Sequence, residues 1–200
     1  MKKLLCEGAK TMDVSLNEDQ VKQLLDYHAL IHKWNKVYNL SAIRDPLESI
    51  KKHFLDSLSI LEFTKPGLLL DVGSGAGLPG IIIAIMKPKT NVFVIDSVGK
   101  KCRFMQTVKT ELGLENLTVI NDRVESFNYP ESFSQITSRA FASAIETVNK
   151  TKHLLSNDGR YLLMKGDNIA QENIENMESK VHTLKVPFVS DKRSLLEIKI

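Results

Sequence analysis

The segment LLLDVGSGAGLPG at residues 68–80 constrains the fold of this chain more than any other feature. An apolar run that leads into closely spaced glycines is typical of a strand, a tight turn and a helix that together hold a nucleotide cofactor. The glycines satisfy two patterns at once: Gly73, Gly75 and Gly77 form G-x-G-x-G, and Gly75, Gly77 and Gly80 form G-x-G-x-x-G. The glycine pattern therefore fits more than one nucleotide cofactor and also a purely structural turn. The residues around the loop must distinguish these interpretations.

Short apolar runs alternate with longer helical stretches from residue 68 onward. This alternation predicts an α/β fold with a doubly wound, mostly parallel sheet that binds ligands at the carboxyl ends of its strands. Only residues 187–193 separate the last two strands, which is too short for a crossover, so these strands should form an antiparallel hairpin. The segments between the first five strands are long enough for crossover helices. In all, seven strands are expected, at 68–72, 92–96, 117–120, 135–138, 160–165, 182–186 and 194–200.

Two helices are expected before the sheet. Ser15 and Glu18 have the spacing of a capping box, and apolar residues at helical spacing follow, which predicts a helix over 16–36. Pro46 directly after Asp45 predicts the start of a second helix that continues to about residue 63. We expect a single domain over 1–200, in which a helical extension (1–64) packs on a Rossmann-like cofactor-binding core (65–200).

Composition excludes some classes of protein. A net charge of +3 is only mildly basic and does not by itself indicate nucleic-acid binding. The apolar runs are far shorter than the roughly 20 residues that a membrane helix needs. The two cysteines, Cys6 and Cys102, have no metal-ligand spacing to histidine. We therefore expect a cytoplasmic monomer with free thiols, without a metal and without a membrane partner.

The acidic residue before the glycines favours a cationic cofactor. In a dinucleotide site the pyrophosphate lies on the loop amides, where Asp71 would repel it, whereas S-adenosylmethionine presents an ammonium group and a sulfonium. Asp96 ends the next strand, where it would accept hydrogen bonds from the ribose of either cofactor. Val124 and Glu125 follow the third strand, where an adenine edge would lie. The loop thus favours S-adenosylmethionine, with a dinucleotide or a structural turn as alternatives.

The segment after the fourth strand bears on the methyl acceptor. It has no Pro-Pro pair of the kind found in methyltransferases of exocyclic amines, and Arg139 stands where ribose 2′-O enzymes place an aspartate. Neither cysteine follows Pro or Thr, as the nucleophile of C5-pyrimidine enzymes usually does. Guanine N7 needs no general base, because its lone pair attacks the methyl group directly and alignment supplies most of the catalysis. The missing catalytic dyad agrees with N7 chemistry.

A series of motifs resembles one known family. The series is WNKVYNLS (34–41), HFLDS (53–57), the glycine loop, DSVGKK (96–101), RVE (123–125), SRAFA (138–142) and KG (165–166). In this order it closely resembles the bacterial 16S ribosomal RNA guanine-N7 methyltransferases, the glucose-inhibited division protein B family, from about residue 20 onward. The resemblance implies a class I S-adenosylmethionine-dependent methyltransferase fold. It also implies methylation of N7 of one guanine in the 530 loop of 16S ribosomal RNA, as free RNA or in the small ribosomal subunit.

The resemblance also implies roles for individual residues. Arg139, Lys165 and Arg123 are expected to position the target or contact RNA, and Lys100, Lys101, Arg123 and Lys165 to bind RNA. The cofactor pocket would be formed by Asp71, Gly73, Ser74, Gly75, Gly77, Leu78, Asp96, Val124, Glu125 and Arg139. Support from the N-terminal helices would come from Asn39, His53 and Asp56.

Several alternatives stay open at this stage. Arg139 could bind the cofactor carboxylate, a phosphate or guanine O6, or could form a structural ion pair. His53 and Asp56 share a helix face and could simply pair with each other. The chain could also be a methyltransferase of a small molecule or protein, an NAD-binding oxidoreductase, or a noncatalytic RNA-binding factor that keeps the cofactor fold.

Overall fold

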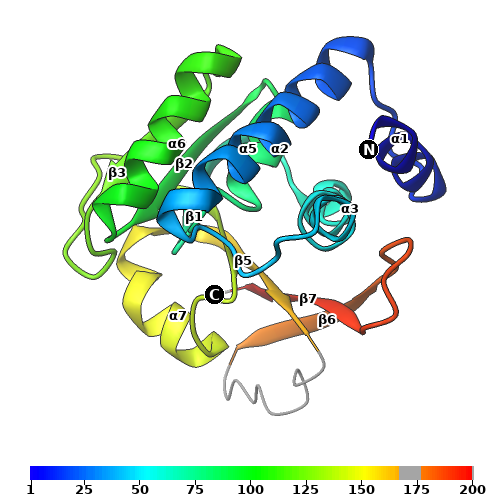
Figure 1. Ribbon diagram of the computed structural model, residues 1–200. Helices are drawn as coiled ribbons and strands as arrows, with labels where there is room; N and C mark the ends of the chain where they lie inside the picture. Colours follow the sequence, from blue (N-terminus) through cyan, green and yellow to red (C-terminus); the bar gives the residue numbers. More distant parts are fainter. Residues whose placement is uncertain (167–176, 200) are drawn as a thin grey trace.

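A seven-stranded sheet forms the centre of the molecule (Figure 1). The computed structural model describes residues 1–166 and 177–199. The sheet has the order β3-β2-β1-β4-β5-β7-β6, and β7 alone runs antiparallel to its neighbours. Its strands are β1 (Gly67–Val72), β2 (Thr90–Asp96), β3 (Leu117–Asn121), β4 (Phe133–Arg139), β5 (Leu155–Lys165), β6 (Glu178–Leu184) and β7 (Arg193–Lys199).

The predicted strands and the antiparallel hairpin are confirmed, with some shifts. β6 begins at Glu178 rather than at residue 182, and β5 begins at Leu155. Residue 200, the last position of the predicted strand 194–200, lies outside the described residues. β7 lies between β5 and β6, so it pairs on both sides, and its Leu195, Leu196 and Ile198 are buried.

Helices form three of the four connections between the first five strands. α5 (Gly80–Met86) joins β1 to β2, α6 (Gly99–Leu112) joins β2 to β3, and α7 (Ala144–Thr151) leads through a 3-10 turn (Lys152–Leu154) to β5. The crossover expected between β3 and β4 contains turns but no helix. Phe127 and Tyr129, two positions apart, stack near each other, and Tyr129 packs on Phe93 and Phe133. This spacing suits an extended segment, not a helix.

The N-terminal part of the chain is mostly helical, with links at residues 12–17 and 39–45. α1 (Lys2–Thr11) was not predicted, α2 (Glu18–Tyr38) was, and the second predicted helix is a continuous series of short elements. This series comprises α3 (Pro46–Ser49), a π-helical segment (Ile50–Leu55), α4 (Asp56–Leu58) and a 3-10 turn (Leu61–Phe63). As predicted, Asp45 caps it, because its Oδ1 accepts a hydrogen bond from the Glu48 amide at 2.8 Å.

The predicted capping box of α2 is wrong by two residues. Asn17, not Ser15, is the N-cap, and Asn17 and Gln20 exchange hydrogen bonds of 2.8 and 3.1 Å. Asparagine caps helices as well as serine does, and this start places Glu18 and Asp19 in the first turn, where the helix dipole favours negative charge. The sequence allows a capping box at Ser15 and Glu18 or at Asn17 and Gln20, and the helix dipole favours the second.

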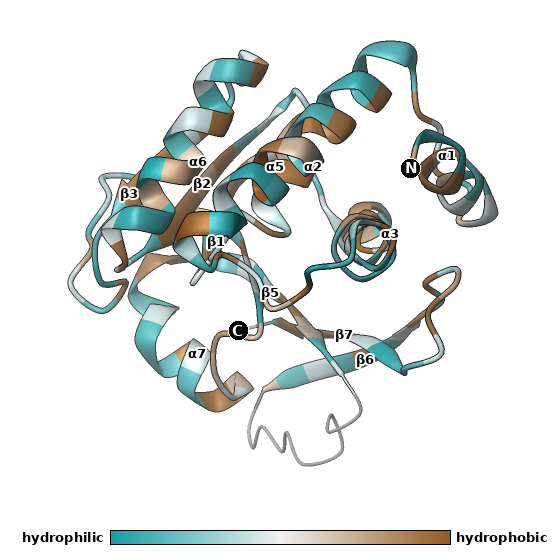
Figure 2. Cartoon of the chain, viewed as in Figure 1, coloured by the Kyte–Doolittle hydropathy of each residue, from teal (hydrophilic) through white to brown (hydrophobic). Residues whose placement is uncertain are grey.

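The sheet has a different apolar layer on each face. Leu69 of β1 packs in a cluster with residues of α1, α2, α5 and α6, whereas its neighbour Leu70 packs with residues of α7. Figure 1 shows α2, α5 and α6 on one side of the sheet and α7 on the other. In Figure 2 the buried strand β2 is coloured hydrophobic and β6 largely hydrophilic. Among the described residues, no helix is long and apolar enough to cross a membrane.

Tyr27 of α2 ties the N-terminal helices to the glycine loop. Its ring is fully buried, and its hydroxyl donates a hydrogen bond to the Ala76 carbonyl. We expect Tyr27→Phe to lower the free energy of unfolding by about 1–3 kcal/mol, because the buried carbonyl loses its donor. Urea unfolding monitored by circular dichroism measures this. Tyr38→Phe is the matched control, since no described residue bonds to the Tyr38 hydroxyl, and equal midpoints for the two variants would contradict the prediction.

Candidate functional site

Two cavities open where the strand order reverses, at the carboxyl ends of β1 and β4. Ala140, directly after β4, lines both of them and has a left-handed backbone with φ of 53°. The first cavity, of about 370 Å³, is lined by Val72, Gly73, Ile95, Asp96, Ser97, Val98, Lys101, Asp122, Arg123, Val124, Glu125, Ala140, Phe141 and Lys150. The second, of about 480 Å³, is lined by Ser41, Ala42, Ile43, Lys52, His53, Asp56, Arg139, Ala140, Ala142, Met164, Lys165, Gly166, Leu184, Arg193 and Ser194.

Asp96 organises the wall of the first cavity. Its Oδ2 accepts hydrogen bonds from the Gly75 amide at 3.0 Å and from Lys101 Nζ at 3.3 Å, and its Oδ1 accepts one from the Val98 amide at 2.9 Å. The side chain is buried, so these contacts fix its orientation. Gly73 and Gly75 have φ of 65° and 63°, a backbone conformation that suits glycine. The glycine loop is thus folded onto the acidic group expected at the ribose.

Asp71 lies beneath the loop, outside both cavities. It is fully buried, and its Oδ2 accepts a hydrogen bond from the Gly80 amide at 3.0 Å. Ser74 Oγ donates to the Asp71 carbonyl at 2.7 Å. Of the loop residues expected in the cofactor pocket, Gly73 lines the first cavity, whereas Asp71, Ser74, Gly75, Gly77 and Leu78 shape the loop behind it.

Burial raises the pKa of Asp71 to about 7, although the Gly80 amide opposes the shift. In the unfolded chain the pKa is near the ordinary 3.8, so the folded chain binds this proton more tightly. Binding of this proton therefore stabilises the folded chain relative to the unfolded chain. This contribution to the free energy of unfolding is complete below about pH 4 and is lost as the pH rises toward 7. Relative to Asp71→Asn, the wild-type chain should lose up to about 1.4 kcal/mol per pH unit in this window. Urea unfolding at pH 5 and pH 8 checks this, and a constant difference between the two proteins would contradict it.

Val124, Glu125 and Lys150 line one part of the first cavity. Val124 is buried, and Glu125 forms an ion pair of 3.3 Å with Lys150 of α7. Phe141 contacts Gly73 so closely that a Cβ on Gly73 would lie 2.4 Å from the ring. The sequence did not point to Phe141 or Lys150 individually, although Phe141 belongs to the SRAFA motif.

The basic residues predicted to bind RNA do not form one group. Lys101 and Arg123 line the first cavity, and Lys165 lines the second, where its Nζ donates to the Ala142 carbonyl at 2.9 Å. Lys100 is exposed and lines neither cavity. A shared RNA surface over all four therefore stays a prediction.

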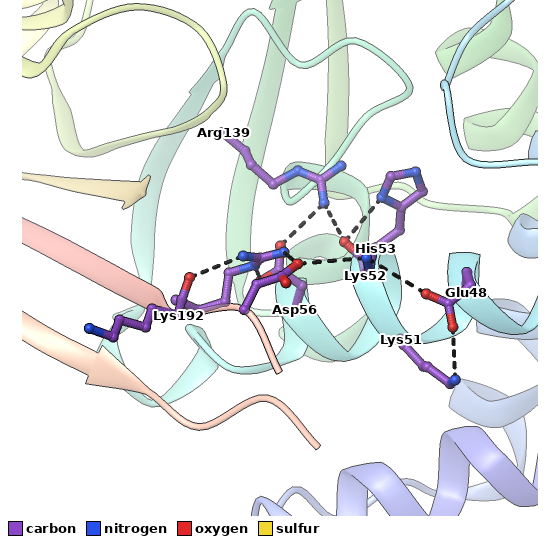
Figure 3. A network of polar contacts seen from close by, with 9 residues as sticks. Glu48, Lys51, Lys52, His53, Asp56, Arg139 and Lys192 are labelled. Atoms are coloured by element: carbon purple, nitrogen blue, oxygen red, sulfur yellow. Dashed lines mark hydrogen bonds and ion pairs between the residues drawn. The ribbon is translucent and has the colours of Figure 1, made fainter. Parts of the chain in front are cut away.

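Asp56 brings two arginines together in the second cavity. Its Oδ2 lies 3.3 Å from Arg139 Nη1, and its Oδ1 lies 3.3 Å from Arg193 Nε. Arg139 Nη1 also donates to the Lys52 carbonyl at 3.0 Å, as Figure 3 shows. Burial raises the pKa of Asp56, while the two guanidinium groups oppose the shift. Arg193, which no sequence motif indicated, is part of this site.

His53 bonds to Ser41 and not to Asp56. The distance from His53 Nε2 to Ser41 Oγ is 2.6 Å, so the expected alternative of a His53 and Asp56 pair does not form. Burial, followed by the nearby Arg139 charge, lowers the pKa of His53 to about 4, which leaves the ring neutral at pH 7. Asn39 is exposed at the end of α2, where its Oδ1 accepts a hydrogen bond from Arg44. It lines neither cavity.

The chain is similar to known proteins over nearly its whole length. Residues 20–196 match the family described as rRNA small subunit methyltransferase G. A ribosomal RNA small subunit methyltransferase G from Ruthia magnifica subsp. Calyptogena magnifica is 51% identical over 193 residues, which cover 96% of this chain and 95% of that protein. The protein of the same name from Pseudomonas fluorescens is 46% identical over 200 residues, which cover 98% and 93%.

Solved structures agree on the fold. The crystal structure of a SAM-dependent methyltransferase from Aquifex aeolicus superposes with a TM-score of 0.62 at 14% identity, covering 81% of this chain and 97% of the other. At this identity the likeness concerns the fold alone, which is the S-adenosylmethionine-dependent methyltransferase fold. On the match over residues 20–196 and the identity to these relatives, the chain belongs to the rRNA small subunit methyltransferase G family.

Proposed function

We propose that this chain methylates N7 of a guanine in the 530 loop of 16S ribosomal RNA, with S-adenosylmethionine as methyl donor. The observation that carries the proposal is the pair of cavities that meet at Ala140. A cofactor in one and a nucleobase in the other would face each other across a single residue. The family assignment supports ribosomal RNA as the acceptor.

The first cavity has the chemistry that S-adenosylmethionine requires. Asp96 offers carboxylate oxygens for the ribose hydroxyls, Val124 and Ile95 offer an apolar surface for the adenine, and Gly73 admits close approach to the backbone. When bound, the cofactor supplies an electrophilic methyl group. The residues of this chain hold it at the carboxyl end of β1, beside the wall that both cavities share.

The second cavity is built for positioning and not for proton transfer. Its carboxylate and its imidazole are already engaged, Asp56 with Arg139 and Arg193, and His53 with Ser41. Attack by guanine N7 releases no proton from that nitrogen, so neither group is needed as a general base. We infer that these residues fix the nucleotide relative to the first cavity, an effect that in favourable cases supplies about 7–11 kcal/mol.

The test is transfer of a labelled methyl group to small ribosomal subunits that lack the modification. Borohydride reduction and aniline cleavage then locate 7-methylguanosine in the RNA. We expect incorporation and cleavage at one guanine of the 530 loop, with none in subunits that already carry the modification. Label without cleavage would contradict N7 as the acceptor, and label only in a protein or small molecule would contradict RNA as the substrate.

A further inference from the structure

A groove lies among the N-terminal helices, apart from both cavities of the site. It has a volume of about 580 Å³ and is lined by residues from the start of α1, from α2 and from the start of α3, none of which lines either cavity. Its apolar wall includes Leu25 and Ala29 of α2 and Pro46 of α3. A hollow of this size with an apolar wall can hold a planar organic group.

The charged side chains of this groove are all cationic. They are Lys2 of α1 and Lys33 and Lys36 of α2, and no aspartate or glutamate among the described residues lines the groove. All three lysines are exposed, and no described residue forms an ion pair or hydrogen bond with their ammonium groups. The carboxylate of Asp26, one turn before Lys33 on α2, is already paired with Lys22 at 2.8 Å. The groove therefore attracts an anionic ligand.

Two histidine rings of α2 also line the groove. Their centroids are 4.4 Å apart, and His28 Nε2 lies 3.0 Å from the Pro46 carbonyl, so the pair is held against the start of α3. Burial lowers the pKa of His28 to about 4, and burial also lowers the pKa of His32, although the charge of Asp45 opposes this shift. His32, the more exposed of the two, is thus a neutral aromatic ring of the kind on which unpaired bases stack.

The link between α2 and α3 joins the groove to the second cavity. Ser41, Ala42 and Ile43 of this link line the second cavity, and Pro46 lines the groove. Ile43 and Pro46 are three residues apart, so their Cα atoms are separated by at most about 11 Å. An RNA strand with its target nucleotide in the second cavity can therefore extend into the groove. It supplies both phosphates for the lysines and bases for the ring, whereas a lipid surface or an acidic peptide supplies only the charge.

We propose that this lysine groove, formed by Lys2, Lys33, Lys36, His32 and Pro46, binds an unpaired nucleotide of 16S ribosomal RNA that flanks the target guanosine. The base lies against His32, and Lys33 and Lys36 bind the phosphates. The inference rests on the proposed function, because it takes RNA as the substrate whose target nucleotide enters the second cavity. The lysine groove holds RNA away from the reacting atoms, so it acts on RNA affinity and not on the chemical step.

Removal of two lysines tests the phosphate contacts. In the double variant Lys33→Ala and Lys36→Ala, we expect KM for small ribosomal subunits to rise about 10-fold while kcat is retained. The slope of log kcat/KM against log salt concentration should become shallower by about 1.4, because each contact to a single-strand phosphate contributes about 0.7. The control double variant, Lys65→Ala and Lys89→Ala, removes exposed lysines before β1 and β2, at the edge of the sheet opposite the cavities. Equal KM values and slopes for the two double variants would overturn the proposal.

Ala29→Glu tests the charge of the groove against a neutral variant of the same size. The new carboxylate would lie one turn before Lys33 on α2, where it repels phosphate and pairs with the lysine. We expect Ala29→Glu to raise KM about 10-fold and Ala29→Gln less than about threefold. Position 29 is exposed and both residues favour a helix, so the urea midpoint and the S-adenosylhomocysteine affinity should be retained. An equal rise in both variants would contradict phosphate binding in the groove.

A photo-cross-link identifies the occupant of the groove. Benzoylphenylalanine is placed at position 2, in place of Lys2, and the variant is irradiated while bound to small subunits. We expect the cross-link in 16S ribosomal RNA near the 530 loop. A cross-link only to a ribosomal protein would assign the groove to a protein partner and overturn the proposal.

Binding of small subunits without the methyl donor, measured by filter retention, separates this inference from the proposed function. If the wild-type chain methylates guanine N7 but the lysine and Ala29→Glu variants bind and react like it, the groove fails and the proposed function stands. If no transfer to N7 occurs but these variants bind subunits about 10-fold more weakly, the proposed function fails and the groove stands as an RNA site.

Discussion

Replacing Asp96 with alanine is expected to weaken S-adenosylhomocysteine binding by about 100-fold or more. Asp96 Oδ2 accepts from the Gly75 amide and Oδ1 from the Val98 amide, so the carboxylate supports the loop as well as the expected ribose contact. Each hydrogen bond to a charged group contributes about 1.5–3 kcal/mol, and the loss of two corresponds to two or more powers of ten in affinity.

Isothermal titration calorimetry measures this effect. Asp158→Ala is the matched control, because Asp158 is exposed and lines neither cavity. Asp96→Asn should give an intermediate affinity, since one acceptor oxygen remains while the charge is lost. A loss of less than about threefold in Asp96→Ala would contradict the role of this carboxylate in the first cavity.

Gly80→Ala is expected to lower the free energy of unfolding by about 2–4 kcal/mol. An added Cβ would lie 2.6 Å from Val94 Cγ1 and 2.8 Å from Asp71 Oδ2, and both neighbours are fully buried. Overpacking of this kind costs about 1–3 kcal/mol. It would also displace the carboxylate that accepts the Gly80 amide, which adds the loss of a buried hydrogen bond.

Urea unfolding of the two proteins tests this prediction. Gly99→Ala is the control, because a Cβ there would meet only Asn121 Oδ1, at 3.2 Å, and should change the free energy of unfolding by less than about 1 kcal/mol. Similar unfolding midpoints for Gly80→Ala and the wild-type chain would show that the contact between α5 and β2 can relax.

Local signals were sufficient for most of the sheet. The apolar runs that end at Asp96 and before the glycine loop are strands, and the short link before β7 forms the predicted hairpin. Prediction from the sequence failed where contacts between distant segments determine the local conformation. The β3 to β4 link contains no helix because Tyr129 packs against Phe93 and Phe133. The π-helical segment Ile50–Leu55 has a helical sequence pattern, which does not distinguish it from an α-helix.

The two cavities differed in how well the sequence predicted them. The carboxyl ends of parallel strands meet at one edge of a sheet, so Asp96, Val124 and Glu125 could be placed together in advance. The second cavity combines residues that follow α2, residues of the π-helical segment and residues of β7. These segments lie far apart in the sequence and belong to no single motif, so the sequence analysis did not place Arg193 in the site. Membership of the family leaves the dinucleotide interpretation of Gly75, Gly77 and Gly80 without support.

The order of the strands has a consequence for synthesis of the protein. β6 precedes β7 in the chain but reaches the sheet only through β7, so β5 keeps an open edge and β6 has no partner until the later strand has been translated. Arg193, at the start of β7, arrives with that strand. A chain made from its N-terminus can therefore assemble the first cavity, which no β7 residue lines, while the second still lacks Arg193 and Ser194.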